Sequence, residues 1–469
     1  RDLRELVDRH EDLVRAGELE VEVVPGDAGD RLGVEAGEAR EAVVLVDDDV
    51  ARAQVGEGAQ GAAARAPVVG ALGAHQRVGT PAHRHHLVER PRQPAQRVVA
   101  LDLDRRCSRR AQQALGKIEE VDAVIGTTAH DEIFDVIEKT LEGQKELDIQ
   151  DVDRLVEIDA KRVVTTGGHY AHLKIAEGCD KHCTYCIIPK IRGNYRSVPM
   201  ERLLKEAQDL ADQGVKELIL VAQETTIYGT DLYGKKSLHI LLKKLCEIKG
   251  IRWIRVLYCY PEEIYDELIE TIRDEKKICH YLDLPIQHAS DRILKRMGRR
   301  TTRAQLEEII GKLRKEIPDI ALRTTLITGF PGETQEDHEE LMTFVDEMEF
   351  DRLGVFTYSQ EEDTPAAAME DQIDEEVKKD RQEELMELQQ EVSLDKNEEK
   401  IGRTMLAMVE GYLSDENVYV ARTYADAPGI DGYLFIDTAE TLMSGDFAKV
   451  KITGALEYDL TGELENEFA

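Results

Sequence analysis

The chain has 469 residues, enough for several domains that each bury a core. Its 61 Lys and Arg residues stand against 95 Asp and Glu residues, and the resulting formal net charge of −34 disfavours nucleic-acid phosphate and favours basic partners. No run of about 18 apolar residues is present, so no membrane span is expected. Seven cysteines are too few for a disulfide scaffold, and we expect a protein of a reducing compartment, the cytoplasm.

The first 116 residues differ in composition from the rest. They contain no Lys, Ile, Phe, Tyr, Asn, Met or Trp, whereas a chain rich in Lys, Ile and Glu begins at Lys117. A folded domain with that composition would be unusual, so we hypothesise that residues 1–116 are foreign to the protein, through a wrong reading frame, the opposite strand or a fusion of unrelated sequence. A divergent domain from a high-GC source is the alternative. The one strand-like run is VVLVDDDV (43–50), and we attribute the histidines of HRHH (83–86) to chance.

From Tyr170 onward, apolar strand-like runs alternate with amphipathic helical stretches. The expected strands are 172–176, 217–222, 253–258, 281–286, 321–328 and 352–358. The expected helices are 199–213, 237–249, 262–275, 289–297, 302–316 and 334–348. Six such repeats with short connections predict an α/β fold, a parallel sheet that curls into a partial (β/α)6 barrel over residues 169–395. Chemistry in such barrels gathers at the carboxyl ends of the strands.

Two further elements follow the barrel strands. Residues 374–400 form a charged helical stretch, and its apolar side is expected to pack on the neighbouring domain. That side consists of Val377, Leu385, Leu388 and Val392. Short strands separated by turns then predict a small all-β barrel over residues 396–469.

The segment EGCDKHCTYCIIP (177–189) places Cys179, Cys183 and Cys186 directly after the first strand of the barrel. A structural zinc site needs four ligands, and His182 could complete the set, but it is adjacent to Cys183 and the two cannot easily face one ion. A 4Fe–4S cluster has four irons, so three thiolates leave one iron open to a substrate or cofactor. The spacing therefore favours a 4Fe–4S cluster over zinc.

C-x3-C-x2-C after the first strand of such a barrel resembles the radical S-adenosylmethionine (SAM) superfamily. That resemblance implies that the open iron binds SAM and that an electron from the cluster cleaves SAM to a 5′-deoxyadenosyl radical. Other segments narrow the likeness to the radical SAM methylthiotransferases, and among them to those that modify an aspartate of ribosomal protein S-twelve. These segments are YAHLKIAEGCDKHCTYCIIPKIRGNYRS, ELILVAQETTIYGTDLYG, WIRVLYCYP, YLDLPIQH, RILKRMGRR, RTTLITGFPGET, DRLGVFTYSQEEDTPAA and GDFAKVKITGALEYDLTGE.

The resemblance covers about three quarters of the chain, residues 117–469, and implies an α/β amino-terminal domain, the radical SAM barrel and a carboxy-terminal TRAM domain. In that family the amino-terminal domain supplies three more cysteines for a second 4Fe–4S cluster. Here residues 117–145 look like an aberrant remnant of that domain and 146–168 like a linker, while Cys107 is the sole cysteine before Cys179 and matches no family motif. If the sequence is translated as written, the second cluster lacks ligands, and SAM cleavage could survive without sulfur transfer.

The same resemblance implies that SAM lies at the mouth of the barrel. The turn GFPGET, with Gly329 and Gly332, is expected near the SAM nucleoside, because glycines let the backbone approach a ligand closely. Arg323 is a charge in an apolar strand, so it could pair with the SAM carboxylate, and a structural ion pair is the open alternative. The remaining residues of the expected SAM site are Tyr185, Gln223 and Glu224.

The resemblance implies a methylthiotransferase that adds sulfur and a methyl group at the β-carbon of an aspartate in ribosomal protein S-twelve, with an electron donor such as a flavodoxin or ferredoxin. Relatives that modify tRNA are the alternative. From Lys396 to Ala469 the chain has 6 Lys and Arg against 15 Asp and Glu, and such an acidic module is poorly suited to RNA. A basic protein is therefore the expected substrate. A relative that cleaves SAM but cannot transfer sulfur is the third possibility.

Overall fold

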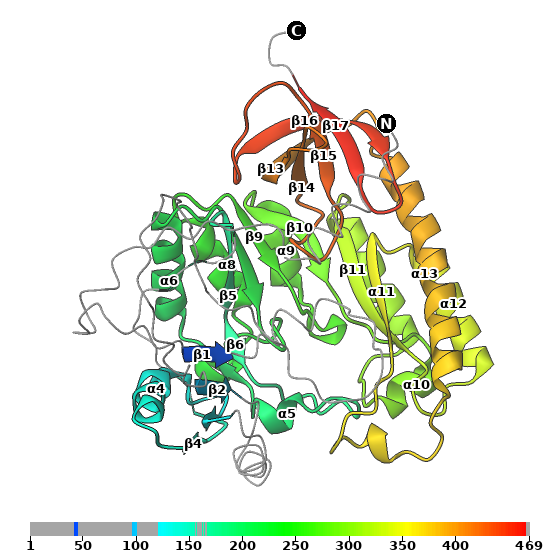
Figure 1. Cartoon of the computed structure of the whole chain (residues 1–469). Helices are drawn as coiled ribbons and strands as arrows, with labels where there is room; N and C mark the ends of the chain where they lie inside the picture. Colours follow the sequence, from blue (N-terminus) through cyan, green and yellow to red (C-terminus); the bar gives the residue numbers. More distant parts are fainter. Residues whose placement is uncertain are drawn as a thin grey trace, which may run out of the picture. The chain divides into compact units, whose positions relative to one another are not determined.

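The computed structural model of the chain describes residues 42–45, 96–100, 121–154, 156, 162, 164 and 167–465 (Figure 1). The chain divides into two compact units, the larger including 160–189 and 193–469 and the smaller consisting of 23–159 and 190–192. Within the described residues, no helix is long and apolar enough to cross a membrane.

The smaller unit contains a parallel sheet in the order β1 (Ala42–Leu45), β2 (Gln96–Ala100), β3 (Ala123–Ile125) and β4 (Glu146–Asp148). A 3-10 turn, η2 (His130–Glu132), leads into α4 (Ile133–Leu141), whose Val136 packs with Ile125 of the sheet. β1 covers the start of the predicted run VVLVDDDV, and the rest of that run and HRHH lie outside the described residues. β4 falls in the stretch for which a linker was expected.

The larger unit is built on a parallel sheet of six strands in the order β12-β11-β10-β9-β8-β5 (Figure 1). The strands are β5 (Tyr170–Lys174), β8 (Glu217–Val221), β9 (Trp253–Val256), β10 (Ile278–Asp283), β11 (Ala321–Thr328) and β12 (Arg352–Thr357). The helices and 3-10 turns around them are α5 (Ile188–Ile191), α6 (Met200–Asp212), α7 (Thr230–Tyr233), α8 (Leu238–Cys246), η3 (Pro261–Glu263), α9 (Asp266–Asp274), α10 (Asp291–Arg296), α11 (Arg303–Glu316), α12 (Gln335–Met348) and η4 (Ala366–Ala368). The predicted partial (β/α)6 barrel is confirmed, with β10 starting three residues before the predicted 281.

Alternation along the strands creates two cores, because successive side chains point to opposite faces of a sheet. Leu218 and Leu220 of β8 pack outward under the helices, whereas Ile219 and Val221 face the inside of the barrel. Two of the helices begin with capping boxes, at Thr302 and Thr334, in which the threonine and the side chain three residues later each bond the other's backbone.

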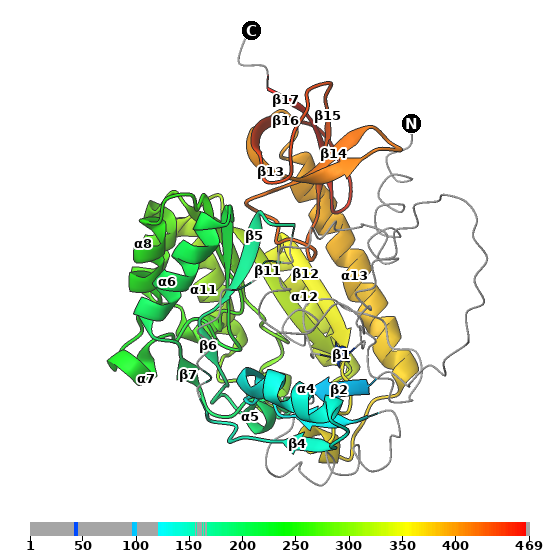
Figure 2. The same ribbon diagram turned by 60° about the vertical axis from the view of Figure 1, so that its left-hand side comes forward.

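The long helix α13 (Glu375–Glu398) packs along β12 through a mostly polar face (Figure 2). Its buried residues are Lys378, Arg381, Leu385, Gln389, Ser393 and Asn397. The predicted apolar side is wrong at Val377, which is 38% exposed. Lys378 Nζ instead donates to the carbonyl of Tyr358 at 2.9 Å and Gln389 Nε2 to that of Phe350 at 2.9 Å, so long polar side chains satisfy strand-end carbonyls that apolar residues could not.

The carboxy-terminal strands close into the predicted small barrel, in the order β13-β14-β15-β17-β16. They are β13 (Thr404–Leu413), β14 (Val418–Thr423), β15 (Leu434–Asp437), β16 (Phe447–Ala455) and β17 (Leu460–Leu464). This barrel lies at the amino ends of the sheet strands, at the opposite end from β6 (Figure 1). Ala425 and Ala427 from its β14–β15 connection join the core inside the large barrel, so both barrels share one hydrophobic cluster.

Candidate active site

The three cysteines lie on a loop that leaves the carboxyl end of β5. Immediately after β5, β6 (Ala176–Glu177) pairs with β7 (Arg196–Ser197) and closes the base of this loop. Cys179 and Cys183 are buried and Cys186 is half-buried. The structure therefore places the predicted cysteine loop at the barrel mouth, where parallel β/α barrels carry their chemistry.

Gly178 and Gln223 fix the start of the cysteine loop. Gly178 has φ +79°, and a Cβ there would lie 2.2 Å from the carbonyl oxygen of Asn194, so no other residue fits. Its backbone N–H donates to Gln223 Oε1 at 2.9 Å, and the N–H of Cys179 donates to the carbonyl of Gly193 at 3.2 Å. Gln223, expected to bind SAM, thus has a direct role in holding the loop.

Thr184 anchors the middle of the loop. Its N–H donates to the carbonyl of Met297 at 2.9 Å and its Oγ1 to the carbonyl of Arg296 at 2.9 Å, while its own carbonyl accepts from Ala366 at 2.9 Å. The cysteines on either side of it are therefore tied to the end of α10 and to η4.

Backbone strain gathers at the same end of the barrel. Four non-glycine residues have left-handed φ values there: His182 (52°) in the cysteine loop, Tyr258 (58°) after β9, Gln287 (72°) after β10 and Asp363 (68°) between β12 and η4. Such conformations cost of order 1–3 kcal/mol each and persist where the surrounding contacts impose them, often at functional sites.

A chain of charges runs beside the cysteines. Lys181 Nζ lies 2.5 Å from Glu263 Oε1, 3.6 Å from Glu262 Oε1 and 3.7 Å from Glu224 Oε2. Glu224 is fully buried, and burial raises its pKa to about 7 although Lys181 favours the ionised form. Sequence reasoning missed Lys181, whose position between Cys179 and Cys183 gave no separate signal.

Arg299 is the second cation at the mouth, and it was also missed. It is 7% exposed, stacks on the ring of Tyr260 with its Cζ 4.4 Å from the ring centre, and donates to the carbonyl of Pro285 at 2.9 Å. The hydroxyl of Tyr260 lies 3.9 Å from Cys183 Sγ. The sequence showed RILKRMGRR as a motif. Which of its arginines is buried depends on contacts with the segments that follow β9 and β10, and these are distant in sequence.

The mouth holds buried polar atoms without a hydrogen-bond partner, and these test whether a cofactor fits. They include Glu224 Oε2, Gln287 Oε1, the Tyr358 hydroxyl, and Nε and Nη1 of Arg299. Unpaired buried polar atoms are costly, so a ligand that supplies donors and acceptors at this end would stabilise the site. The residues present fit a polar ligand such as SAM.

The protonation and the arrangement of the cysteines are both compatible with an iron–sulfur cluster. Burial raises the pKa of Cys179 to about 12 and that of Cys186 to about 11, so both are neutral thiols unless a bound cation removes their protons. Among the described residues, no three His, Cys, Asp or Glu side chains converge on a single metal ion. The thiolates of a cubane cluster each bind a different iron, so they need not converge in that way.

The other predicted SAM residues contact this chain's own side chains. Arg323 Nη1 donates to Asp283 at 2.9 Å, and its Nε lies 3.4 Å from Asp431 of the small barrel, which is the structural ion pair left open above. Gly329 and Gly332 have φ values of +69° and +78°, and a Cβ on them would meet Lys378 at 2.2 Å and Asp371 at 2.3 Å. The Tyr185 side chain packs with Phe330 and Tyr358.

The sequence profile of the Radical SAM superfamily matches residues 173–345, and that of the TRAM domain matches residues 401–464. The fold and site thus define a radical SAM protein with a TRAM domain. One relative, "Ribosomal protein uS12 methylthiotransferase RimO" of Lachnoclostridium phytofermentans, is 64% identical over 351 residues, 75% of this chain and 80% of the relative. The protein of the same name from Clostridium botulinum is 51% identical over 352 residues, 75% of this chain and 78% of that one.

This chain belongs to the RimO family of radical SAM methylthiotransferases, and it is a transferase that uses a 4Fe–4S cluster and SAM. The aligned length, 351 residues, is close to that of the part of the chain from Lys117 onward in which the motifs lie. Among solved structures, the radical SAM methyltransferase TsrM of Kitasatospora setae is similar with a TM-score of 0.43 and 14% identity, over 58% of each chain.

Proposed function

We propose that this chain adds a methylthio group to the β-carbon of an aspartate in ribosomal protein S-twelve, and that Cys179, Cys183 and Cys186 hold the cluster that binds SAM. The observation that carries the proposal is the cysteine loop itself, three thiols on one pinned segment at the barrel mouth. When bound there, a reduced 4Fe–4S cluster and SAM supply the radical that removes a hydrogen atom from the substrate.

The chain's own residues position the ligand. Glu224 Oε2 and Gln287 Oε1 are free to accept hydrogen bonds from the ammonium or hydroxyl groups of SAM. Gln223 holds the backbone of Gly178 and so keeps the cysteines in place. The ring of Tyr185 packs against the hydrophobic cluster that contains Phe330 and Tyr358, and this contact supports the cysteine loop. Arg323, Gly329 and Gly332 have contacts within the chain, and the proposal does not rely on them.

The choice of a protein over tRNA rests on charge. The segment from Lys396 to Ala469 carries 6 basic against 15 acidic residues. One of the six, Arg422, is fully buried against Glu217, so it is not available to a phosphate. A surface of this sign attracts the basic ribosomal protein and repels RNA. The names of the curated relatives point to the same substrate.

The number of clusters decides whether sulfur transfer follows SAM cleavage, and we propose that the cysteines of this sequence supply the ligands of one. Cys246, Cys259 and Cys279 lie in or against the hydrophobic core of the larger unit, which leaves Cys107 as the only other cysteine. A second cluster would need three ligands that this sequence does not contain. The electron donor, a flavodoxin or ferredoxin in this proposal, would act in the cytoplasm.

The test is to reconstitute the whole chain anaerobically, count iron and sulfide, and incubate it with SAM, dithionite and ribosomal protein S-twelve. We expect about four irons per chain and release of 5′-deoxyadenosine. A methylthio mass gain on the ribosomal protein would show complete activity, and 5′-deoxyadenosine without that gain would favour the form unable to transfer sulfur. Modification of tRNA instead would contradict the proposed substrate.

A further inference from the structure

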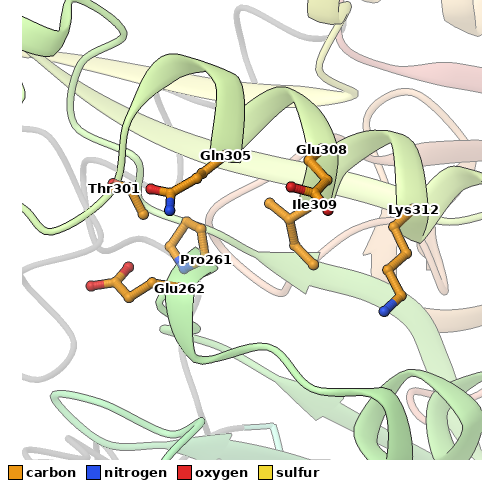
Figure 3. A pocket seen from close by; sticks show the side chains of 7 residues that line it. All are labelled: Pro261, Glu262, Thr301, Gln305, Glu308, Ile309 and Lys312. Atoms are coloured by element: carbon orange, nitrogen blue, oxygen red, sulfur yellow. The ribbon is translucent and has the colours of Figure 1, made fainter.

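A cavity of about 230 Å³ lies between η3 and the start of α11 (Figure 3). It is lined by Pro261, Glu262, Thr301, Gln305, Glu308, Ile309 and Lys312. Its volume far exceeds the ~30 Å³ that one water molecule occupies, so it can hold a group of several atoms. Figure 3 shows Glu262, Thr301 and Gln305 gathered around Pro261, with Glu308 and Lys312 further along the helix.

Two side chains of this cavity carry buried oxygens without a hydrogen-bond partner. Thr301 is 5% exposed and its Oγ1 has no partner. Glu262 has one carboxylate oxygen 3.6 Å from Lys181 Nζ, while the other oxygen has none. Both atoms can accept a hydrogen bond, and leaving a buried acceptor unpaired costs about 1–3 kcal/mol. A ligand that donates hydrogen bonds to these oxygens would remove this cost, once a rotation of the two side chains turns the oxygens toward the cavity.

The charges that face the cavity select a cation. Glu262 and Glu308 are acidic, and the one basic residue of the lining, Lys312, is bonded to Asp266. Throughout the described residues, no three His, Cys, Asp or Glu side chains could hold a metal ion together, so the site suits an organic cation rather than a divalent metal. Pro261 and Ile309 provide the apolar wall that the methylene stem of such a group needs.

The cavity adjoins the candidate active site. Pro261 and Glu262 follow the carboxyl end of β9, and Glu262 contacts Lys181, which lies between Cys179 and Cys183. Gln305, Glu308 and Lys312 are exposed, so the cavity is open to a macromolecule that reaches the barrel mouth. A side chain held here would lie one side chain away from the cysteine loop.

We propose that this cavity binds a lysine or arginine side chain of the protein substrate and so orients the modified segment at the barrel mouth. The identity of that substrate rests on the function proposed above, whereas the preference of the cavity for a cation does not. Glu262 and Glu308 would pair with the positive charge, and Thr301 would accept a hydrogen bond from it.

The first experiment measures binding of ribosomal protein S-twelve to the full chain without SAM. Glu262→Gln and Glu308→Gln together should weaken binding roughly tenfold, because both charges facing the cation are lost. The matched control is Glu339→Gln together with Glu387→Gln, which removes two charges from exposed positions on α12 and α13 and should leave affinity unchanged. Equal affinity for the parent and the double variant would overturn the inference while leaving the proposed function intact.

The second experiment does not depend on the substrate. N-acetyl-arginine amide, titrated into the full chain, should bind saturably, and its uncharged citrulline analogue should not. Thr301→Val, which keeps the shape of the side chain, should weaken this binding several-fold without loss of thermal stability, since it removes an unpaired oxygen. Failure of the arginine probe to saturate, or equal binding of the citrulline analogue, would overturn the inference even if ribosomal protein S-twelve proves to be modified.

Discussion

The two ends of the large barrel bury polar groups in opposite ways. At the amino end, beneath the small barrel, Glu217 lies 2.9 Å from Arg255 and also bonds Arg422, and Arg352 pairs with Asp426 at 2.6 Å. At the carboxyl end, Glu224, Gln287, Tyr358 and Arg299 keep buried polar atoms without partners. The buried charges of the amino end are nearly all paired, whereas several buried polar atoms of the carboxyl end are available to a ligand.

This difference separates structural charge from functional charge. A buried ion pair whose two groups are fully hydrogen-bonded holds two elements in register. Removing one partner leaves the other charge buried and unpaired in a low dielectric. The network at the amino end joins residues from both barrels, and within the described part of the chain only Arg255 Nη2 of its buried side-chain atoms lacks a partner. The unpaired atoms at the mouth hold no two elements together, so changes that remove only those atoms should affect ligand binding more than folding.

The largest effect is expected at the mouth from the triple substitution of Cys179, Cys183 and Cys186 by Ala. The reconstituted variant should be colourless and should release no 5′-deoxyadenosine from SAM with dithionite, because the cluster has lost its protein ligands. Iron content and 5′-deoxyadenosine are the measurements. Cys246→Ala, a cysteine of α8 outside the loop, is the matched control and should keep both. Cleavage activity in the triple variant would refute the ligand assignment.

The next effect is expected at the amino end from Glu217→Ala. This change leaves Arg255 and Arg422 buried without their shared carboxylate, which should lower the free energy of unfolding by about 3–5 kcal/mol. Urea unfolding of the whole chain measures the loss. Glu206→Ala, an α6 carboxylate in an exposed pair with Arg162, should cost less than about 1 kcal/mol. Similar losses in both variants would show that the two ends do not differ as described.

Gly178→Ala, a substitution at the mouth of the barrel, should have a smaller effect. The alanine Cβ would lie 2.2 Å from the carbonyl oxygen of Asn194 at φ +79°, so the base of the cysteine loop must shift, at a cost of about 1–3 kcal/mol. We expect reduced iron retention during gel filtration with little change in the far-ultraviolet circular dichroism of the whole chain. Gly311→Ala is the control, because a Cβ there meets nothing within 4 Å.

Sequence periodicity predicted the strands, the helices and the end of the barrel that carries the cysteines, because these depend on local patterns. It could not show that Arg323 would pair with Asp431, since the two are brought together only when the small barrel docks on the large one. The same limit applies to α13, where the buried face is polar and the exposed Val377 looked like part of an apolar side. Side chains such as Arg299 act through contacts between distant connections, and no local spacing reports them.

The smallest effect is expected from the substitution of Lys400, which lies just after α13 at the amino end of the barrel. Unlike the other buried charges at that end, Lys400 is bonded to an uncharged side chain. Its Nζ donates to Asn397 Oδ1 at 2.9 Å. Burial, with help from nearby Arg352, lowers the pKa of Lys400 from 10.5 to about 8. Below pH 8 the lysine is charged in both states, and its buried charge lowers the stability of the folded chain. Between pH 8 and about 10.5 the folded state loses the proton while the unfolded state keeps it, so this loss of stability shrinks. Above that range the loss of stability vanishes. Lys400→Met should therefore raise the free energy of unfolding by about 1–2 kcal/mol at pH 7, with the gain over the parent disappearing toward pH 10.5. Lys379→Met, at an exposed position of α13, should show no such pH-dependent difference. A loss of stability in Lys400→Met at pH 7 would mean that this lysine is as well paired as its neighbours, and the two ends of the barrel would then differ more sharply.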